Sequence, residues 1–133
     1  MTETKKVEKK AQGNVVRDFF LTSAEHFKEE VVEFQDGKGK TLKVLIREPN
    51  AKERGQIFKA ATKLKRNQEA EIDHAELQVW AVIYCAHDFE SGEPLFEPAH
   101  RDILLKLPSS VFDVLAKPAI AMIGEEPEEV AGN

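Results

Sequence analysis

The segment Leu42–Arg54 constrains the fold most strongly, because it changes from strand chemistry to a helix start within a few residues. Alternate residues from Leu42 to Ile46 are apolar, which is the two-residue period of a half-buried strand. Pro49 cannot donate to a strand ladder, and Asn50 followed three positions later by Glu53 has the pattern of a capping box. The segment therefore predicts a strand, a break and a helix.

The residues before this segment predict the other half of a β-hairpin. Phe27–Phe34 has the composition of an imperfect strand, and the Asp36-Gly37 turn signal separates it from the strand Thr41–Glu48. Further upstream lies the apolar triplet Phe19–Leu21. We expect this triplet to pack across the hairpin, and the alternative is that it acts as a short docking motif.

The helix that starts after Asn50 is expected to be amphipathic. Its apolar side holds Ile57, Ala61 and Leu64, with Phe58 beside them. Cations recur on another face, at Lys52, Lys59, Lys63 and Arg66. Gly55 costs about 1 kcal/mol relative to alanine inside a helix, which suggests the close approach of a neighbouring backbone. The polar tract 67–72 is expected to be a connection.

The apolar run Leu77–Ala86 fits either a central helix or a buried strand. Asp73 and Glu76 repeat the spacing of a helix cap, and the segment from this cap to Ala86 is longer than ten residues, so we favour a helix. In that helix Trp80 and Tyr84, four positions apart, share one face and anchor the core.

The last third of the chain predicts a turn-rich connection and two helices. The connection 89–98 is centred on Ser91-Gly92. A short helix is expected over Pro98–Leu107 and a final helix over Ser110–Ile123, which Pro118 should kink or divide.

These elements predict an α+β fold, with an N-terminal β-hairpin packed against a bundle of about four helices. A chain of 133 residues suits one domain, which we place at residues 18–124. Residues 1–17 are expected to be a disordered basic arm and residues 125–133 a disordered acidic tail. The charged N-terminus predicts neither a secretory leader nor a membrane span, and the single cysteine, Cys85, fits a reducing cytoplasm.

Two motifs resemble nucleotide chemistry but lack its other requirements. Gly39-Lys40-Thr41 resembles the end of a phosphate-binding loop, yet Phe34 stands where the first glycine belongs and a strand follows instead of a helix. His100-Arg101-Asp102 resembles a kinase catalytic loop, but Leu107 replaces the required asparagine. Both matches are therefore read as accidental.

No catalytic or metal-binding cluster stands out in the sequence. The four histidines are not spaced by three or four positions: His26, His74, His87 and His100. Cys85 within an apolar run is expected to be an inert core thiol. His87 beside Asp88 and Glu90 could in principle do acid–base work, but a solvated helix end explains these residues more simply. We therefore expect a protein that is not an enzyme and has no cofactor or metal.

The cationic residues of the helix after Asn50 are the best nucleic-acid candidate in the sequence. A formal net charge of −5 and the lack of aromatic residues among these cations favour a solvated face instead. A nucleic-acid-binding regulator is therefore the alternative function, and nucleic acid is not expected as a partner.

The segment Ile103–Ile123 has more large apolar residues than one core-facing stripe needs. Its two helices either close over Trp80 and bury everything or leave a surface for a partner. Our site hypothesis is that Phe112, Leu115 and Met122 contact another chain.

In order and spacing, three stretches of this chain resemble the tail assembly chaperones of long-tailed bacteriophages and related prophages: LKVLIREPNAKERGQIF, VIYCAHDFESGEPLF and RDILLKLPSSVFDVLAKPAIAMIG. At the junction between the predicted strand and helix, the residues that match the family pattern are Arg47, Glu48, Glu53 and Arg54, which we call the junction residues. In the connection 89–98, the residues that match the family pattern are Gly92, Pro94, Leu95 and Phe96, which we call the turn residues. The resemblance covers residues 41–124.

This resemblance implies a non-catalytic protein of the host cytoplasm that is not retained in the mature virion. Its implied partners are the tail tape measure protein and the tail tube protein, with self-association possible and no membrane involved. Many members of the family also occur in a longer, frameshifted form. A structural tail or head–tail component of the virion is a further alternative.

Overall fold

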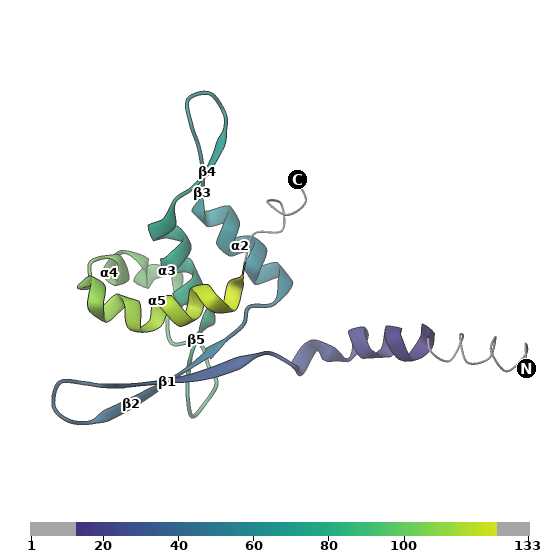
Figure 1. Cartoon of the computed structure of the whole chain (residues 1–133), viewed down its shortest axis with the longest axis horizontal. Helices are drawn as coiled ribbons and strands as arrows, with labels where there is room; N and C mark the ends of the chain where they lie inside the picture. The colour runs from purple at the N-terminus through teal and green to yellow at the C-terminus, as the bar shows by residue number, and fades with distance from the viewer. Residues whose placement is uncertain (1–12, 125–133) are drawn as a thin grey trace, which may run out of the picture.

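The computed structural model describes residues 13–124. Its body is a small antiparallel sheet with helices packed on one face (Figure 1). The strands are β1 (Glu29–Gln35), β2 (Thr41–Arg47), β3 (Thr62–Leu64), β4 (Ala70–Ile72) and β5 (Ala86–Asp88). The helices are α2 (Ala51–Ala61), α3 (His74–Cys85), α4 (Arg101–Leu105) and α5 (Ser109–Ile123), with 3-10 turns η1 (Ser23–Glu25) and η2 (Pro98–His100). The α+β class predicted from the sequence is confirmed.

The predicted hairpin forms, and a third strand extends it. β1 pairs with β2 from Glu29–Arg47 to Gln35–Thr41. In the turn between them, the Asp36 carboxylate accepts the Lys38 amide at 2.7 Å. β5 then pairs with β2, so the sheet order is β1-β2-β5. The sequence did not predict β5, because an Ala-His-Asp stretch has little strand propensity of its own.

The capping box at the start of α2 is confirmed. Asn50 Oδ1 accepts a hydrogen bond from the Glu53 backbone amide at 2.8 Å, and Glu53 Oε1 accepts one from the Asn50 backbone amide at 3.0 Å. α2 ends at Ala61, earlier than predicted, because β3 and β4 form a second hairpin in which Gln68 adopts a φ of 67°. Leu64 is therefore 75% exposed instead of lying on the apolar side of the helix. The close approach expected at Gly55 is also wrong, because nothing lies within 4 Å of a Cβ built there.

The apolar run after Asp73 is a helix, as the sequence favoured. The Asp73 side chain accepts the Glu76 amide at 3.1 Å and caps α3. α3 is apolar nearly all the way round because it lies at the centre, in contact with α2, α4, α5 and β2. Trp80 and Tyr84 share a face with ring centroids 6.3 Å apart, and both pack partly buried against the core.

The last helix continues through Pro118. The expected division of this helix is therefore wrong. Ala116 and Ala119, on either side of the proline, are both buried in the core. Core packing on both sides of the proline thus keeps the helix continuous, although Pro118 has no backbone N–H to donate a hydrogen bond.

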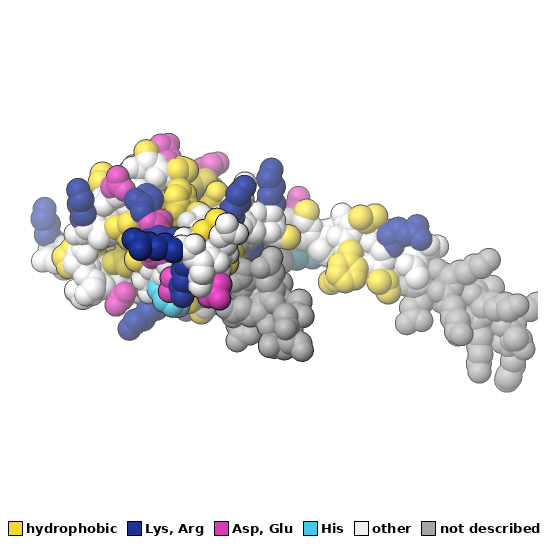
Figure 2. Space-filling view, turned by 90° about the horizontal axis from the view of Figure 1, so that it is seen from above, with side chains coloured by type: hydrophobic (Ala, Val, Ile, Leu, Met, Phe, Trp, Pro, Cys, Tyr) yellow, Lys and Arg dark blue, Asp and Glu magenta, His cyan; other side chains and the backbone are white. Residues whose placement is uncertain are grey.

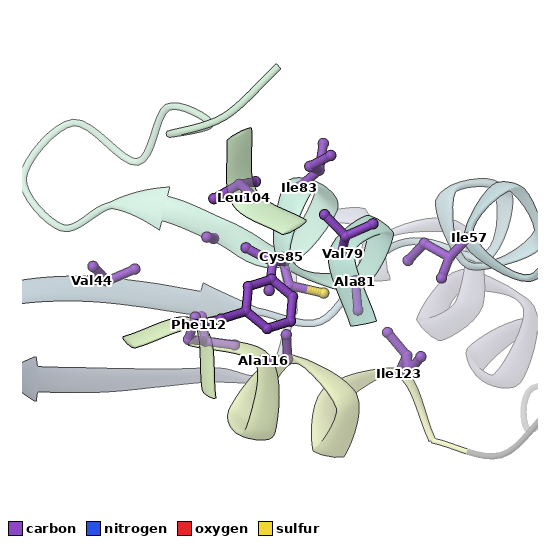
Figure 3. Close-up of a cluster of buried hydrophobic side chains, with 14 of the residues drawn as sticks. Val44, Ile57, Val79, Ala81, Ile83, Cys85, Leu104, Phe112, Ala116 and Ile123 are labelled. Carbon is purple, nitrogen blue, oxygen red and sulfur yellow. The ribbon is translucent and has the colours of Figure 1, made fainter. Parts of the chain in front are cut away.

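One hydrophobic core joins the sheet to the helices (Figure 3). Ile46, Val79 and Val82 are fully buried at its centre. Phe112 of α5 belongs to the same cluster and is 9% exposed. Among residues 13–124, no helix is both long and apolar enough to cross a membrane.

An N-terminal helix over residues 13–21 stands clear of the body (Figure 1). Residues 13–17, which we predicted to belong to a disordered arm, are helical here. The expected packing of the triplet Phe19–Leu21 across the hairpin is wrong, since the side chains are 60, 71 and 73% exposed. The predictions of disorder for residues 1–12 and 125–133 lie outside the described residues.

Phe112→Ala should lower the free energy of unfolding by about 3–5 kcal/mol, because it removes a ring from the packed core. Val111→Ala, at a neighbouring side chain that is 53% exposed, is the matched control and should cost less than about 1 kcal/mol. Urea denaturation followed by circular dichroism measures both values. Equal effects from the two variants would contradict the position of Phe112 in the core.

Candidate interaction surfaces

Arg47 and Glu48, the first two junction residues, stabilise the start of the hairpin. Arg47 Nε donates to Glu29 Oε2 at 3.0 Å across the β1–β2 pair. Glu48 Oε1 accepts the Lys28 amide at 2.9 Å, while the Glu48 amide donates to the Lys28 carbonyl. These contacts set the register of the strands and leave Arg47 and Glu48 in structural roles.

The other two junction residues organise α2. Glu53 closes the capping box, as described above. Arg54 Nε donates to the Ile123 carbonyl at 2.6 Å, and the guanidinium carbon lies 5.3 Å from the centroid of the Phe58 ring. This contact ties the last turn of α5 to the first turns of α2.

The turn residues close the free side of β5. Gly92 takes a φ of +75°, which suits glycine, and its amide donates to the Asp88 carbonyl at 2.8 Å. Pro94 forms an isolated bridge with His87, and the Leu95 amide donates to the Ala86 carbonyl at 3.1 Å. The turn therefore folds back along the edge of the sheet.

Glu76 is the centre of a polar cluster that joins α3 to α4. Its carboxylate accepts hydrogen bonds from Trp80 Nε1 and Arg101 Nε, each at 3.0 Å. The Arg101 guanidinium donates a second hydrogen bond, from its Nη2, to the same carboxylate. The Glu76 side chain is only 14% exposed. In the sequence analysis, Glu76 belonged to a predicted helix cap and Arg101 to an accidental match to a kinase motif. Neither observation predicted the Glu76–Arg101 ion pair.

Cys85 and His87 have environments that oppose reactivity. Burial raises the pKa of the Cys85 thiol to about 12, which leaves no thiolate at neutral pH. Burial and the nearby Arg47 lower the pKa of His87, and its Nδ1 lies 3.2 Å from the Gly92 carbonyl oxygen. Asp88 accepts the Ser91 amide, which lowers the pKa of its carboxyl group. His87 and Asp88 therefore serve the turn after β5, while Cys85 belongs to the core.

The remaining histidines do not assemble a metal site. His26 and His74 are exposed, and His100 packs edge-on against Phe96 with ring centroids 6.1 Å apart. Across residues 13–124, there is no group of three or more histidine, cysteine or acidic side chains that could hold a metal ion.

The predicted cationic helix face does not form. Lys52 and Lys59 lie on α2, but Lys63 belongs to β3 and Arg66 to the loop after it. Lys63 pairs with Asp73, and their side-chain hydrogen bond is the main cause of a lowered Asp73 pKa. The cations are therefore divided among α2, β3 and the loop after β3, and Lys63 is paired with a carboxylate.

The proposed partner residues of the last helix do not form one exposed surface. Phe112 is in the core, and Leu115 and Met122 are partly buried against it. The exposed large apolar side chains of this region are Ile103 and Val111, at 64 and 53%. We call these two residues and the turn between them the α4–α5 corner.

The largest group of exposed apolar side chains belongs to the N-terminal helix. Steps of 100° per residue place four of them on one side of residues 13–21: Val15, Val16, Phe19 and Phe20. The two phenylalanine rings contact each other edge to face, with centroids 5.3 Å apart. Figure 2 shows these side chains gathered on the projecting helix, apart from the body. We call this group the arm face.

A smaller group of apolar side chains lies on the sheet face that points away from the helices, among charged side chains of β1 and β2 that form ion pairs with one another. The register brings Val31, Leu45 and His87 side by side across the three strands. Lys43 and Arg47, the neighbours of Leu45 on this face, lie over the rings of Phe89 and Phe27, at 5.2 and 5.8 Å from the ring centroids. Val31 is 44% exposed and Phe89 42%. We call this region the outer sheet face.

Thiol labelling tests the environment of Cys85. Because its pKa is about 12 and its side chain is buried, the folded protein at pH 8 should react with a chromogenic disulfide reagent far more slowly than the protein in guanidinium chloride. Absorbance at both conditions measures the two rates. Stoichiometric labelling of the native protein at the unfolded rate would contradict the burial of the thiol.

Comparison with known proteins gives an informative likeness of fold. No family model matches the chain, and no curated protein gives a significant match. Among solved structures, the fold is similar to that of the bacteriophage HK97 tail assembly chaperone, with a TM-score of 0.51 and 16% sequence identity. The alignment covers 83% of this chain and 98% of that chain. The likeness is one of fold, and it extends over almost the whole of the HK97 protein.

Proposed function

We propose that this protein is a phage tail assembly chaperone that binds the tape measure protein and helps to recruit tail tube subunits. The single observation that supports this most is the likeness of fold to the HK97 tail assembly chaperone, which covers 98% of that chain. The sequence stretches that resemble the same family, in residues 41–124, point in the same direction.

The physical task of such a chaperone is to cover apolar segments of another chain. A tape measure protein is long and helical, and its apolar segments would aggregate before the tube encloses them. Covering them requires exposed apolar side chains on a stable body. The α4–α5 corner meets this requirement, because Ile103 and Val111 are exposed while the neighbouring Leu104 and Phe112 are held in the core.

The role we propose is non-catalytic and takes place in the host cytoplasm. The non-catalytic part of this proposal is supported by the structural roles of Cys85, His87 and Asp88, which are engaged by burial or by the turn after β5. The alternative of a nucleic-acid-binding regulator has less support, since the cations it requires are divided among α2, β3 and the loop after β3.

Co-expression with a tape measure protein tests the proposed function. We expect the tape measure protein to stay soluble when this chain is present and to aggregate when it is absent, and centrifugation followed by gel analysis measures the soluble fraction. No difference between the two conditions would overturn the chaperone role. Stoichiometric presence of this chain in purified particles would favour a structural tail component instead.

A charge substitution at the α4–α5 corner tests the surface. The double variant Ile103→Glu/Val111→Glu should lose most of the solubilising effect, because a carboxylate cannot be buried against an apolar partner without a large cost. Ser110→Glu adds a similar charge at an exposed position of the same turn and should keep the effect. Thermal unfolding should remain within a few degrees of wild type for both. Full activity of the double variant would exclude this corner as the binding surface.

A further inference from the structure

The turn between β1 and β2 contains the one Asp-Gly pair of the sequence, Asp36-Gly37, and both residues are exposed. We propose that Asp36 is a modification site, at which the chain isomerises spontaneously to isoaspartate. The modified chain is then a substrate for enzymes that methylate isoaspartate. This inference is independent of the proposed tail function.

The reaction joins the side chain of Asp36 to the backbone of Gly37. The Gly37 nitrogen attacks Asp36 Cγ and forms a C–N bond, while the N–H proton and one carboxyl oxygen leave as water. The product is a succinimide ring. Water then adds at the backbone carbonyl carbon of Asp36 and breaks its bond to the Gly37 nitrogen, so that the main chain runs through Cγ. The water lost in the first step is regained in the second, and the reaction needs no oxidant, reductant or cofactor.

The attacking nitrogen is accessible in this turn. Within residues 13–124 the Gly37 amide donates no hydrogen bond, whereas the Asp36 amide donates to the Lys40 carbonyl at 3.0 Å. Nothing lies within 4 Å of a Cβ built at Gly37, so no neighbouring group blocks the approach. Gly37 has a φ of +84°, which favours glycine. The turn thus requires at this position the residue that shields its own nitrogen least.

The carboxyl group of Asp36 is folded back over the same turn. Its Oδ1 accepts hydrogen bonds from the Lys38 amide at 2.7 Å and from the Lys40 amide at 3.2 Å. An aspartate side chain that bonds the amide two residues on closes a ring around the peptide between them. That peptide contains the Gly37 nitrogen. The reacting carbon is therefore held on the side of the nucleophile and does not extend into solvent.

The other aspartates lack this combination, because each is followed by a residue with a side chain. Three of them lie in helices: Asp18, Asp102 and Asp113. Asp88 is the best internal comparison, since its carboxylate also accepts a backbone amide of a turn, that of Ser91 at 2.8 Å. Its neighbour is Phe89, so the Asp88 turn has a held carboxylate without the unshielded nitrogen.

Isomerisation would disrupt the turn that joins β1 to β2. The main chain gains one carbon atom at residue 36, and the carboxylate that accepts the Lys38 and Lys40 amides is displaced. Within the described part of the chain, β1 pairs with β2 alone. A defect at this turn therefore loosens an edge strand, and the folded hairpin has a limited chemical lifetime.

Ageing the folded full chain for several weeks in warm neutral buffer tests the site. Peptide mapping with electron-transfer fragmentation distinguishes the two isomers, and it should find isoaspartate at residue 36 and none at residue 88. A folded chain without isoaspartate at residue 36 would overturn the proposal, even if the isomer forms in urea, because the turn would then protect the pair. Equal amounts at residues 36 and 88 would overturn it as well.

A matched variant links the modification to the hairpin. Asp36→Ser keeps a hydroxyl that can accept a turn amide but has no carboxyl carbon, so the aged variant should lose the methyl transfer that an isoaspartyl methyltransferase gives with aged wild type. The isoaspartate form of wild type, separated by ion exchange, should unfold at a lower urea concentration than unaged protein. Aged Asp36→Ser should keep its midpoint. Methyl transfer to the aged variant at the wild-type level would contradict the assignment to Asp36.

Discussion

The burial of α3 is the interaction on which the rest of this structure depends. Val79, Val82 and Cys85 are completely enclosed, and the helix contacts the sheet on one side and α2, α4 and α5 on the others. Because few of its positions face water, α3 needs almost no polar stripe, and its one partly buried carboxylate, Glu76, is paired with Arg101. The surrounding elements are arranged so that each covers a different side of this helix.

Elements with strong local chemistry were predictable from the sequence. The Asn50 cap, the Asp36-Gly37 turn and the alternation in β2 depend on neighbouring residues and were found where expected. β5 and the β3–β4 hairpin were not predictable, because their residues form strands only through partners distant in sequence or through the φ of +67° at Gln68. The burial of Phe112, which the sequence analysis assigned to a partner surface, was not predictable for a related reason. A helical stripe shows that side chains share a face, but it does not show whether that face is covered.

The residues that resemble the tail assembly chaperones have structural roles in this chain. Arg47 pairs across the hairpin, Glu53 caps α2, and Gly92 allows the turn that folds beside β5. Such residues preserve a fold while the exposed surface is free to vary, which is consistent with a likeness of fold at 16% identity. Among residues 13–124, exposed apolar side chains occur on the arm face, the outer sheet face and the α4–α5 corner.

The bond between Arg54 and the Ile123 carbonyl determines where the chain leaves the body. It holds the end of α5 against α2, and Gly124, the last residue that the structure describes, has a φ of +69°. α5 has 15 residues and is therefore about 22 Å long, so this exit point lies a full helix length from the α4–α5 corner. A fluorescent or affinity fusion attached after residue 124 would thus emerge beside α2, at a site remote from the corner where we place the partner.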